Sequence, residues 1–337
     1  MSLEKIAKIA GVSKSTVSRV INDDINVSEK TRALVKKVIE EVGYNPNSAA
    51  RSLVTKRTQT IGVAIPNAIS ILFDTSFYFP TILRGISKTT SERHYATLLF
   101  IGESGEDDLR FSRRIMHRKM MDGIIIVSPT LGHPLFDELI QSGTPFISAD
   151  RVVHPRQNIN YITVENIESS RKAVNHLIQQ NRSRVAMLAG NPNIIDTLDR
   201  IEGYKLALAD HQIPFDPDLL MVEEYSYEFG YQSIQSLIDK GIDFDSVYAS
   251  QSTLAVGAVN ALMDNHISLP DQVSLIAFDD LADAMNPRIR ISTMHQPVFE
   301  KGALLASTLI DLIEGKIEPP IQRFLPTELI VRDTCGA

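Results

Sequence analysis

The sequence predicts an all-α N-terminal head followed by an α/β core of two doubly wound parallel-sheet subdomains. Helical periodicity dominates the first part of the chain, whereas short β-branched runs alternating with helical patterns fill the rest. These runs are too numerous for one ordinary doubly wound domain, and 337 residues suffice for two or three domains with real cores. We therefore expect two βα subdomains with a ligand between them, at the carboxyl ends of the strands.

Two short helices joined by a tight turn are predicted from Leu3 to Asn22. The first helix carries its apolar residues at i, i+3, i+4 and i+7, namely Leu3, Ile6, Ala7 and Ala10. Gly11 follows where a left-handed residue is needed, and Ser13 can cap the next helix through its hydroxyl. That second helix turns Val17, Val20 and Ile21 inward and leaves an outward set of Lys14, Ser15, Ser18, Arg19 and Asn22.

The outward set is short, polar and basic, as on the face that helix–turn–helix proteins place in the major groove. Arg19 can pair with guanine O6 and N7, and Ser15 and Ser18 can reach base edges or phosphates. The alternative is a small helical hairpin with a solvated polar face, because helix–turn–helix patterns are permissive.

A third helix is expected after a Ser28 cap, with Gly43 as its end. Its apolar positions are Val35, Val38, Ile39 and Val42. Pro46 breaks that helix, and Asn47 can cap one more short helix of about two turns. That segment has too little apolar surface to be stable alone, so we expect it to fold only when docked.

Charge is distributed unevenly along the chain. Residues 1–60 hold 11 Lys+Arg and 6 Asp+Glu, a net charge of +5, so residues 61–337 carry −12 of the total of −7. A basic head on an acidic body indicates that the head meets a polyanion. A chain without an 18-residue apolar run or a signal-peptide pattern, and with the single cysteine Cys335, is expected to be cytoplasmic.

The predicted core strands are short and apolar. They lie in TIGVAIP, ATLLFIG, DGIIIVSP, PFISAD, RVAMLAG, SVYAS and VSLIAF. No GxGxxG follows a strand, and GxxxxGK[ST], HExxH, GxSxG and metal-type Cys/His spacings are absent from the sequence. Asp150, Asp279 and Asp280 stand at strand ends without a partnered base or nucleophile, which favours binding or capping over catalysis. We expect a non-enzyme with no cofactor and no metal.

The head carries IAKIAGVSKSTVSRVIN, VSEKTRALVKKVIEEVGYNPN and AARSL, and the core carries IGVAIP, RGI, DGIII, ADR, RIEGY, LAVGAV, FDD and LPTELIVRD. With these segments the chain resembles the LacI/GalR family of bacterial transcriptional regulators. The resemblance implies a periplasmic-binding-protein-like core, a homodimer, a small effector in the cleft and a pseudo-palindromic DNA operator. It places the head and hinge helix at 1–58 and the core at 59–337. The implied N-subdomain is about 59–163 with 298–325, and the implied C-subdomain is about 164–297 with 326–337.

The family's DNA contacts can be transferred residue by residue. Base-reading positions fall on Lys14, Ser15 and Arg19, and phosphate-contacting positions fall on Thr16, Ser18 and Asn22. The hinge helix falls on residues 47–53, from Asn47 to Leu53. Leu53 matches a minor-groove wedge, with Ala50 packed beside it.

The family's effector contacts map onto Asp150, Arg200, Asp279 and Gln296, where an Arg and an Asp can hold sugar hydroxyls. Phe77 and Phe79 can stack on a sugar, or can be plain core aromatics. Gln251-Ser252 replaces the usual Asn-Asp, which puts one hydroxyl contact in doubt, although Ser252 can still cap a helix.

The run SFYFPTILRGIS resembles maltose-operon-type repressors and implies an α-glucoside effector. The competing interpretation is a sugar-binding or transport component whose helical head does not bind DNA.

Overall fold

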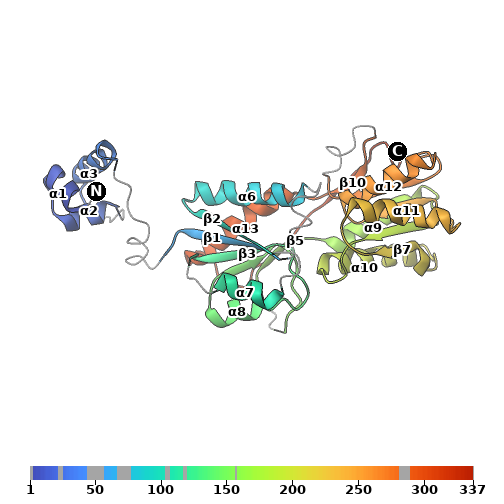
Figure 1. Ribbon diagram of the computed structural model, residues 1–337, viewed down its shortest axis with the longest axis horizontal. Helices are drawn as coiled ribbons and strands as arrows, with labels where there is room; N and C mark the ends of the chain where they lie inside the picture. The colour runs from blue at the N-terminus through green and yellow to red at the C-terminus, as the bar shows by residue number, and fades with distance from the viewer. Residues whose placement is uncertain are drawn as a thin grey trace. The chain divides into compact units, whose positions relative to one another are not determined.

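The computed structural model describes residues 3–21, 26–43, 57–66, 77–102, 107–116, 120–155, 158–280 and 289–336. The chain forms two compact units, Met1–Gln59 and Thr60–Ala337 (Figure 1). Four of the predicted DNA contacts, Asn22, Asn47, Ala50 and Leu53, and with them the predicted hinge helix, lie outside the described residues.

The head consists of α1 (Leu3–Ala10), α2 (Lys14–Ile21) and α3 (Glu29–Glu41). Gly11 has φ +66°, as the tight turn requires. The Ser13 hydroxyl accepts the Thr16 N–H at 3.1 Å, and the Ser28 hydroxyl accepts the Thr31 N–H at 3.3 Å. The apolar faces close on a small core of Ile6, Ala7, Ala10, Val17, Val20, Val27, Val35 and Val38. The predicted helices and their caps are confirmed.

The first sheet of the core has the strand order β11-β5-β4-β3-β1-β2. Its strands are β1 (Thr60–Ile65), β2 (Ala96–Ile101), β3 (Gly123–Ile126), β4 (Phe146–Ser148), β5 (Tyr161–Val164) and β11 (Gln322–Leu325). All of its pairs are parallel. Figure 1 shows α6 (Tyr78–Glu92) and α13 (Val298–Ile313) on one face, with α7 (Asp108–Met116) and α8 (Leu135–Ser142) on the other.

The second sheet has the order β12-β10-β9-β8-β6-β7. Its strands are β6 (Val185–Ala189), β7 (Leu220–Val222), β8 (Ser246–Ala249), β9 (Ser274–Phe278), β10 (Ser292–His295) and β12 (Glu328–Ile330). One face packs on α9 (Asn166–Gln179) and α10 (Ile195–Asp210), the other on α11 (Tyr227–Asp239) and α12 (Ser252–Asp264), and the 3₁₀ turn η1 (Pro217–Leu219) precedes β7. The doubly wound core is confirmed, except that β12 pairs antiparallel with β10.

The chain passes between the two sheets three times: after β5, after β10 and between β11 and β12. The predicted runs contain the central strands, but β5, β7, β10, β11 and β12 were not predicted. These strands have only three or four residues, and several are partly polar. Such short segments become strands because a neighbouring strand supplies their hydrogen bonds, which no local pattern records.

Two glycines of the family motifs allow helices to pack closely. A Cβ at Gly85 of RGI would lie 2.1 Å from the Phe299 carbonyl oxygen of α13. A Cβ at Gly203 of RIEGY would lie 2.2 Å from the Ile167 carbonyl oxygen of α9. These contacts fix α6 against α13 and α10 against α9, and thereby set where the first turns of α6 and α10 stand.

The longest described helices, α10 and α13, have 16 residues each. At 1.5 Å per residue they extend about 24 Å, less than the roughly 30 Å of a bilayer's hydrocarbon core. Among the described residues, no helix is long and apolar enough to cross a membrane.

Candidate functional site

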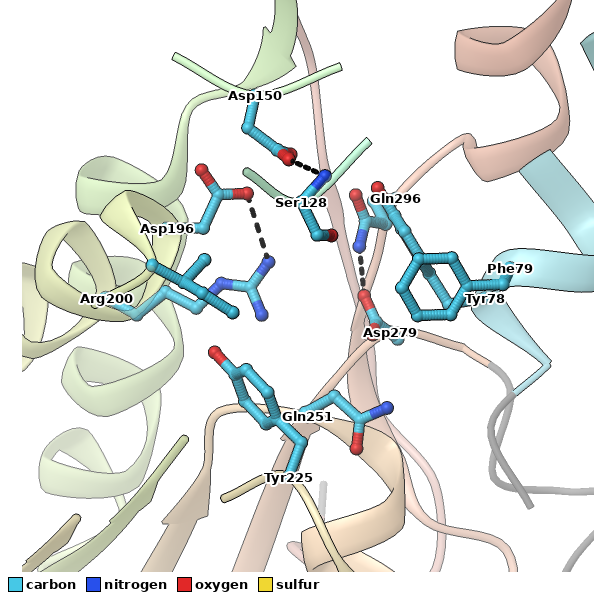
Figure 2. Close-up of a pocket in the computed structure, with 11 residues that line it drawn as sticks. Tyr78, Phe79, Ser128, Asp150, Asp196, Arg200, Tyr225, Gln251, Asp279 and Gln296 are labelled. Carbon is cyan, nitrogen blue, oxygen red and sulfur yellow. Dashed lines mark hydrogen bonds and ion pairs between the residues drawn. The ribbon is translucent and has the colours of Figure 1, made fainter. Parts of the chain in front are cut away.

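A cavity with about 560 Å³ of space lies between the two subdomains of the core. Most of the lining residues follow the carboxyl ends of strands, where ligands of doubly wound sheets bind. They are Tyr78, Phe79, Ser128, Asp150, Ile194, Asp196, Arg200, Tyr225, Gln251, Asp279 and Gln296 (Figure 2).

The wall from the first subdomain is held by a buried lysine. Lys301 of α13 has a side chain only 1% exposed, and its Nζ donates to Asp150 Oδ1 at 3.4 Å and to the Tyr78 hydroxyl at 3.2 Å. The other oxygen of Asp150 accepts the Ser128 N–H at 2.7 Å. Burial alone lowers the pKa of Lys301, but Tyr78, Asp150 and Asp196 outweigh it, so the pKa is raised and the amine stays charged.

The wall from the second subdomain is organised around Arg200. Its Nε donates to Asn166 Oδ1 at 2.9 Å and its Nη1 donates to the Ser250 carbonyl at 2.6 Å. The guanidinium also lies over the Phe278 ring, 3.7 Å from the centroid. These contacts fix the plane of the guanidinium group. Its Nη2 atom faces the Asp196 carboxylate, 3.9 Å from Oδ2 (Figure 2).

Asp279 and Gln296 form a hydrogen-bonded pair beside Arg200. Gln296 Nε2 donates to Asp279 Oδ1, and burial raises the pKa of Asp279 against the opposing effects of Arg200 and of this hydrogen bond. The Gln296 Oε1 is buried and finds no hydrogen-bond partner among the described residues. A buried carbonyl of this kind calls for a donor, which a ligand hydroxyl can supply.

Gln251 corrects one expectation from the sequence. The helix α12 begins at Ser252, so the N-cap position falls on Gln251, whose side chain accepts the Thr253 N–H at 2.6 Å. Ser252 was expected to be able to cap a helix, but its hydroxyl is buried and has no partner among the described residues. The longer Gln side chain reaches the free N–H that Ser252, already inside the helix, cannot satisfy.

Six of the seven residues proposed for effector binding line the cavity: Phe79, Asp150, Arg200, Gln251, Asp279 and Gln296. Phe77 does not line it and is 44% exposed at the start of α6. The lining residues that sequence reasoning missed are Tyr78, Ser128, Ile194, Asp196 and Tyr225, with Lys301 directly behind. Asp196 could have been found one turn before Arg200 on the same helix face, whereas a lysine in the apolar α13 gave no signal.

Direct bonds join the two subdomains at the rim of the cavity. Arg151 donates to both carboxylate oxygens of Asp199, at 2.5 and 3.1 Å. Next to this pair, Thr130 and Ile194 form an isolated antiparallel bridge, and the Leu131 N–H donates to the Asn193 carbonyl at 2.7 Å. The separation of the two walls is therefore held by contacts that a movement of the subdomains would break.

The predicted DNA-reading residues lie on the outer side of α2. Lys14, Ser15 and Arg19 are exposed, and Thr16 and Ser18 are half-buried. Lys14 forms an ion pair with Glu4 of α1 at 2.7 Å, with both side chains more than half exposed. Lys14 lowers the pKa of Glu4 through this hydrogen bond.

Comparisons with known proteins match both parts of the chain. The family model of bacterial regulatory proteins, lacI family, matches residues 2–47, and that of the periplasmic binding protein-like domain matches residues 174–335. The HTH-type transcriptional regulator CelR of Thermobifida fusca is 31% identical over 334 residues, 99% of this chain and 98% of that protein. The HTH-type transcriptional regulator MalR of Streptococcus pneumoniae is 28% identical over 315 residues, 93% of each chain.

Among solved structures, a transcriptional regulator CelR–cellobiose complex has a TM-score of 0.76 and 29% identity, and the match covers 99% of both chains. The helix–turn–helix head, the two-sheet core and these relatives agree along the whole length of the chain. The protein belongs to the LacI family and is a DNA-binding transcriptional regulator.

Proposed function

We propose that this protein is a repressor whose affinity for its operator is controlled by a sugar, a glucoside, bound between the core subdomains. The observation that carries the proposal is the cavity, which gathers fixed polar groups from both subdomains around apolar ring faces. A relative supports this ligand class, because a CelR was solved as a complex with cellobiose. The α-glucoside implied by the sequence and a β-glucoside such as cellobiose are the two arms of the test.

The chemistry of the cavity suits a polyhydroxyl ligand. Arg200 Nη2 can donate to ligand hydroxyls, and Asp279 and Gln296 can accept from them. Phe79 and Tyr225 offer ring faces to the apolar side of a sugar. Arg200, Asp279 and Tyr225 belong to the second subdomain and Phe79 to the first, so a ligand that uses all four joins the walls.

A ligand that joins the walls can act on DNA through their relative orientation. We propose a homodimer that binds a pseudo-palindromic operator in the cytoplasm, with one head on each half-site. We propose that a hinge helix at 47–53 would be too short to be stable alone, so that the first subdomains control whether it folds. By linkage, sugar and operator must change each other's affinity by the same factor.

The test uses the full-length protein and duplex DNA selected by it from a randomised pool. Operator affinity is measured by fluorescence anisotropy without sugar, with maltose and with cellobiose. We expect one sugar to weaken binding by about tenfold or more, and the affinity to fall log-linearly with salt. The proposal is contradicted if the protein selects no DNA sequence from the pool. It is also contradicted if no sugar in a wider panel of glucosides changes the operator affinity.

The reading face is tested separately by Arg19→Ala. A lost bidentate base contact costs about 1–3 kcal/mol and relaxes selectivity at one base position. Lys37→Ala is the matched control, because Lys37 is an exposed base on α3, 73% exposed and paired with Glu41. Unchanged selectivity in Arg19→Ala means that the register of the recognition helix is wrong.

Leu53→Ala tests the proposed minor-groove wedge. Without the wedge, DNA bending and operator affinity should both fall, while sugar binding to the core stays unchanged. Bending is read by the change in energy transfer between dyes at the two operator ends. If Leu53→Ala bends the operator as much as the parent protein does, this segment acts only as a linker between head and core.

A further inference from the structure

Three carboxylates among the described residues line the cavity, and one of them has an oxygen without a hydrogen-bond donor in that part of the chain. Asp150 is held by Lys301 and the Ser128 N–H, and Asp279 is held by Gln296. Asp196 differs, because its Oδ1 is buried with no hydrogen-bond partner among the described residues, and its Oδ2 lies 3.9 Å from Arg200 Nη2. Figure 2 shows its carboxyl group beside the cavity, between Asp150 and Arg200.

A buried carboxylate oxygen without a hydrogen-bond donor is unfavourable for folding. Asp196 is 8% exposed, and its ion pair with Arg200, one turn further along α10, involves Oδ2 and leaves Oδ1 without a donor among the described residues. A buried acceptor without a donor loses its hydration, and the ion pair with Arg200 at 3.9 Å is too long to replace that hydration with a hydrogen bond. No described residue supplies that donor, and a hydroxyl of a ligand in the cavity can supply it.

We propose that Asp196 makes this cavity selective for uncharged sugars: it accepts a hydrogen bond from a ligand hydroxyl and repels phosphorylated or carboxylated sugars. This inference rests on the proposed function and adds the charge class of the ligand. Among the described residues, the lining carries three carboxylates and one cation, Arg200, and the Lys301 amine behind them already contacts Asp150 and Tyr78. Within this part of the lining, an anionic group would meet more negative than positive charge.

The proposal predicts a pH dependence whose sign follows from the surroundings of Asp196. Burial raises the pKa of Asp196 to about 7. The charges of Asp150 and Asp199 raise this pKa further, and those of Lys301 and Arg200 lower it. The Asp196 charge in turn raises the pKa of three nearby groups, Tyr78, Tyr225 and Arg151. A donated ligand hydroxyl favours the ionised carboxylate and lowers this pKa in the complex. Binding therefore releases a proton, and affinity increases by about tenfold from pH 6 to pH 8.

The experiment is calorimetric titration of the full-length protein with maltose, cellobiose and maltose 6′-phosphate at pH 6, 7 and 8, in buffers of different ionisation enthalpy. We expect the parent to prefer the uncharged disaccharide that it binds over its phosphorylated form by about tenfold or more. Asp196→Asn should lose about tenfold in affinity for the uncharged sugar, since a charge-assisted hydrogen bond is replaced by a weaker one to a neutral amide oxygen. The sugar affinity of the variant should no longer depend on pH between 6 and 8. The variant should also show a smaller affinity ratio between the uncharged disaccharide and its phosphorylated form.

Folding of the variant is checked by thermal unfolding at pH 8. The folded-state pKa of Asp196 lies above its unfolded value, so this group destabilises the fold as pH rises from about 4 through 7. Asp196→Asn is therefore expected to unfold at a higher temperature than the parent at pH 8. Asp210→Asn is the matched control, an exposed Asp on the same helix paired with Arg171, and it should leave sugar binding unchanged.

The outcomes separate the two proposals. If no glucoside binds the parent, the proposed function fails and this inference fails with it. If the parent binds a sugar with the same affinity at pH 6 and pH 8, or if Asp196→Asn binds it as tightly as the parent, only this inference is overturned. If the parent binds maltose, equal affinity for maltose and maltose 6′-phosphate also overturns it; if it binds cellobiose, the same comparison is made with cellobiose 6′-phosphate.

Discussion

Two lysine–carboxylate pairs of this protein have the same chemistry in opposite environments. Lys301 and Asp150 in the core are 1% and 3% exposed and 3.4 Å apart, whereas Lys14 and Glu4 in the head are 59% and 69% exposed and 2.7 Å apart. The shorter pair is the weaker constraint, because water and salt screen it. Burial, more than distance, decides which lysine is committed to the fold and which can exchange its partner, as the proposed base contact of Lys14 requires.

A third pair lies between these extremes. Arg151 and Asp199 are 31% and 11% exposed and join the two core subdomains. A pair with this intermediate exposure stabilises one arrangement of the two subdomains but can still break. A regulator whose subdomains change their relative orientation needs such a contact. The three environments order the effects expected from substitution.

The largest effect is expected for Lys301→Met. Removing the amine leaves the buried Asp150 charge without its cation, which costs about 3 kcal/mol or more of unfolding free energy. Denaturant unfolding of the core measures it. Lys316→Met, at an exposed lysine paired with Glu314, is the control and should change stability little. The double variant Lys301→Met with Asp150→Asn should recover part of the lost unfolding free energy. If Lys301→Met alone is as stable as the parent, burial does not make this pair a stronger constraint than the exposed Lys14–Glu4 pair.

A large effect on regulation is expected for Arg200→Ala and Asp279→Ala. Each should keep operator binding in the absence of sugar but lose the response, with sugar affinity falling by about 100-fold because charge-assisted hydrogen bonds are lost. Sugar is titrated against preformed operator complexes. Arg184→Ala, whose pair with Asp216 lies outside the cavity, is the control. A normal response in both variants would mean that the sugar binds elsewhere.

A smaller effect is expected for Arg151→Gln. Loss of the link to Asp199 should favour separation of the subdomains and weaken sugar binding by about three- to tenfold, because part of the binding free energy must then close the cleft. Calorimetry gives the affinity, and small-angle scattering gives the dimensions. The control is Arg171→Gln, whose pair with Asp210 lies within one subdomain. Unaltered affinity would show that the link is only a surface contact.

The smallest effect is expected for Glu4→Gln. Without its carboxylate partner, Lys14 is freer to meet DNA, so operator affinity should rise modestly, and the gain should shrink as salt increases. Anisotropy titrations at two salt concentrations measure this. Glu41→Gln, at the far end of α3 and paired with Lys37, should leave affinity unchanged. Weaker operator binding in Glu4→Gln would mean that the pair orients Lys14 for DNA.

The sequence by itself determined the head and most of the cavity. Helical spacing, Gly11 and the Ser13 and Ser28 caps are local signals, so the head followed from them directly. Asp150 and Asp279 were found because they end apolar strands, and the family motifs supplied Arg200 and Gln296. Carboxyl ends of parallel strands meet at one edge whatever the details of packing, so these positions could be inferred before any coordinates.

Only the tertiary structure decided which of these groups are already satisfied. Lys301 reaches Asp150 across 151 positions of the chain, and Arg151 reaches Asp199 from the other subdomain. Asp196 is without a donor because of what surrounds it and not because of its neighbours in sequence. A residue's type and spacing are local properties, whereas burial and hydrogen-bond satisfaction depend on which distant segments the fold brings together.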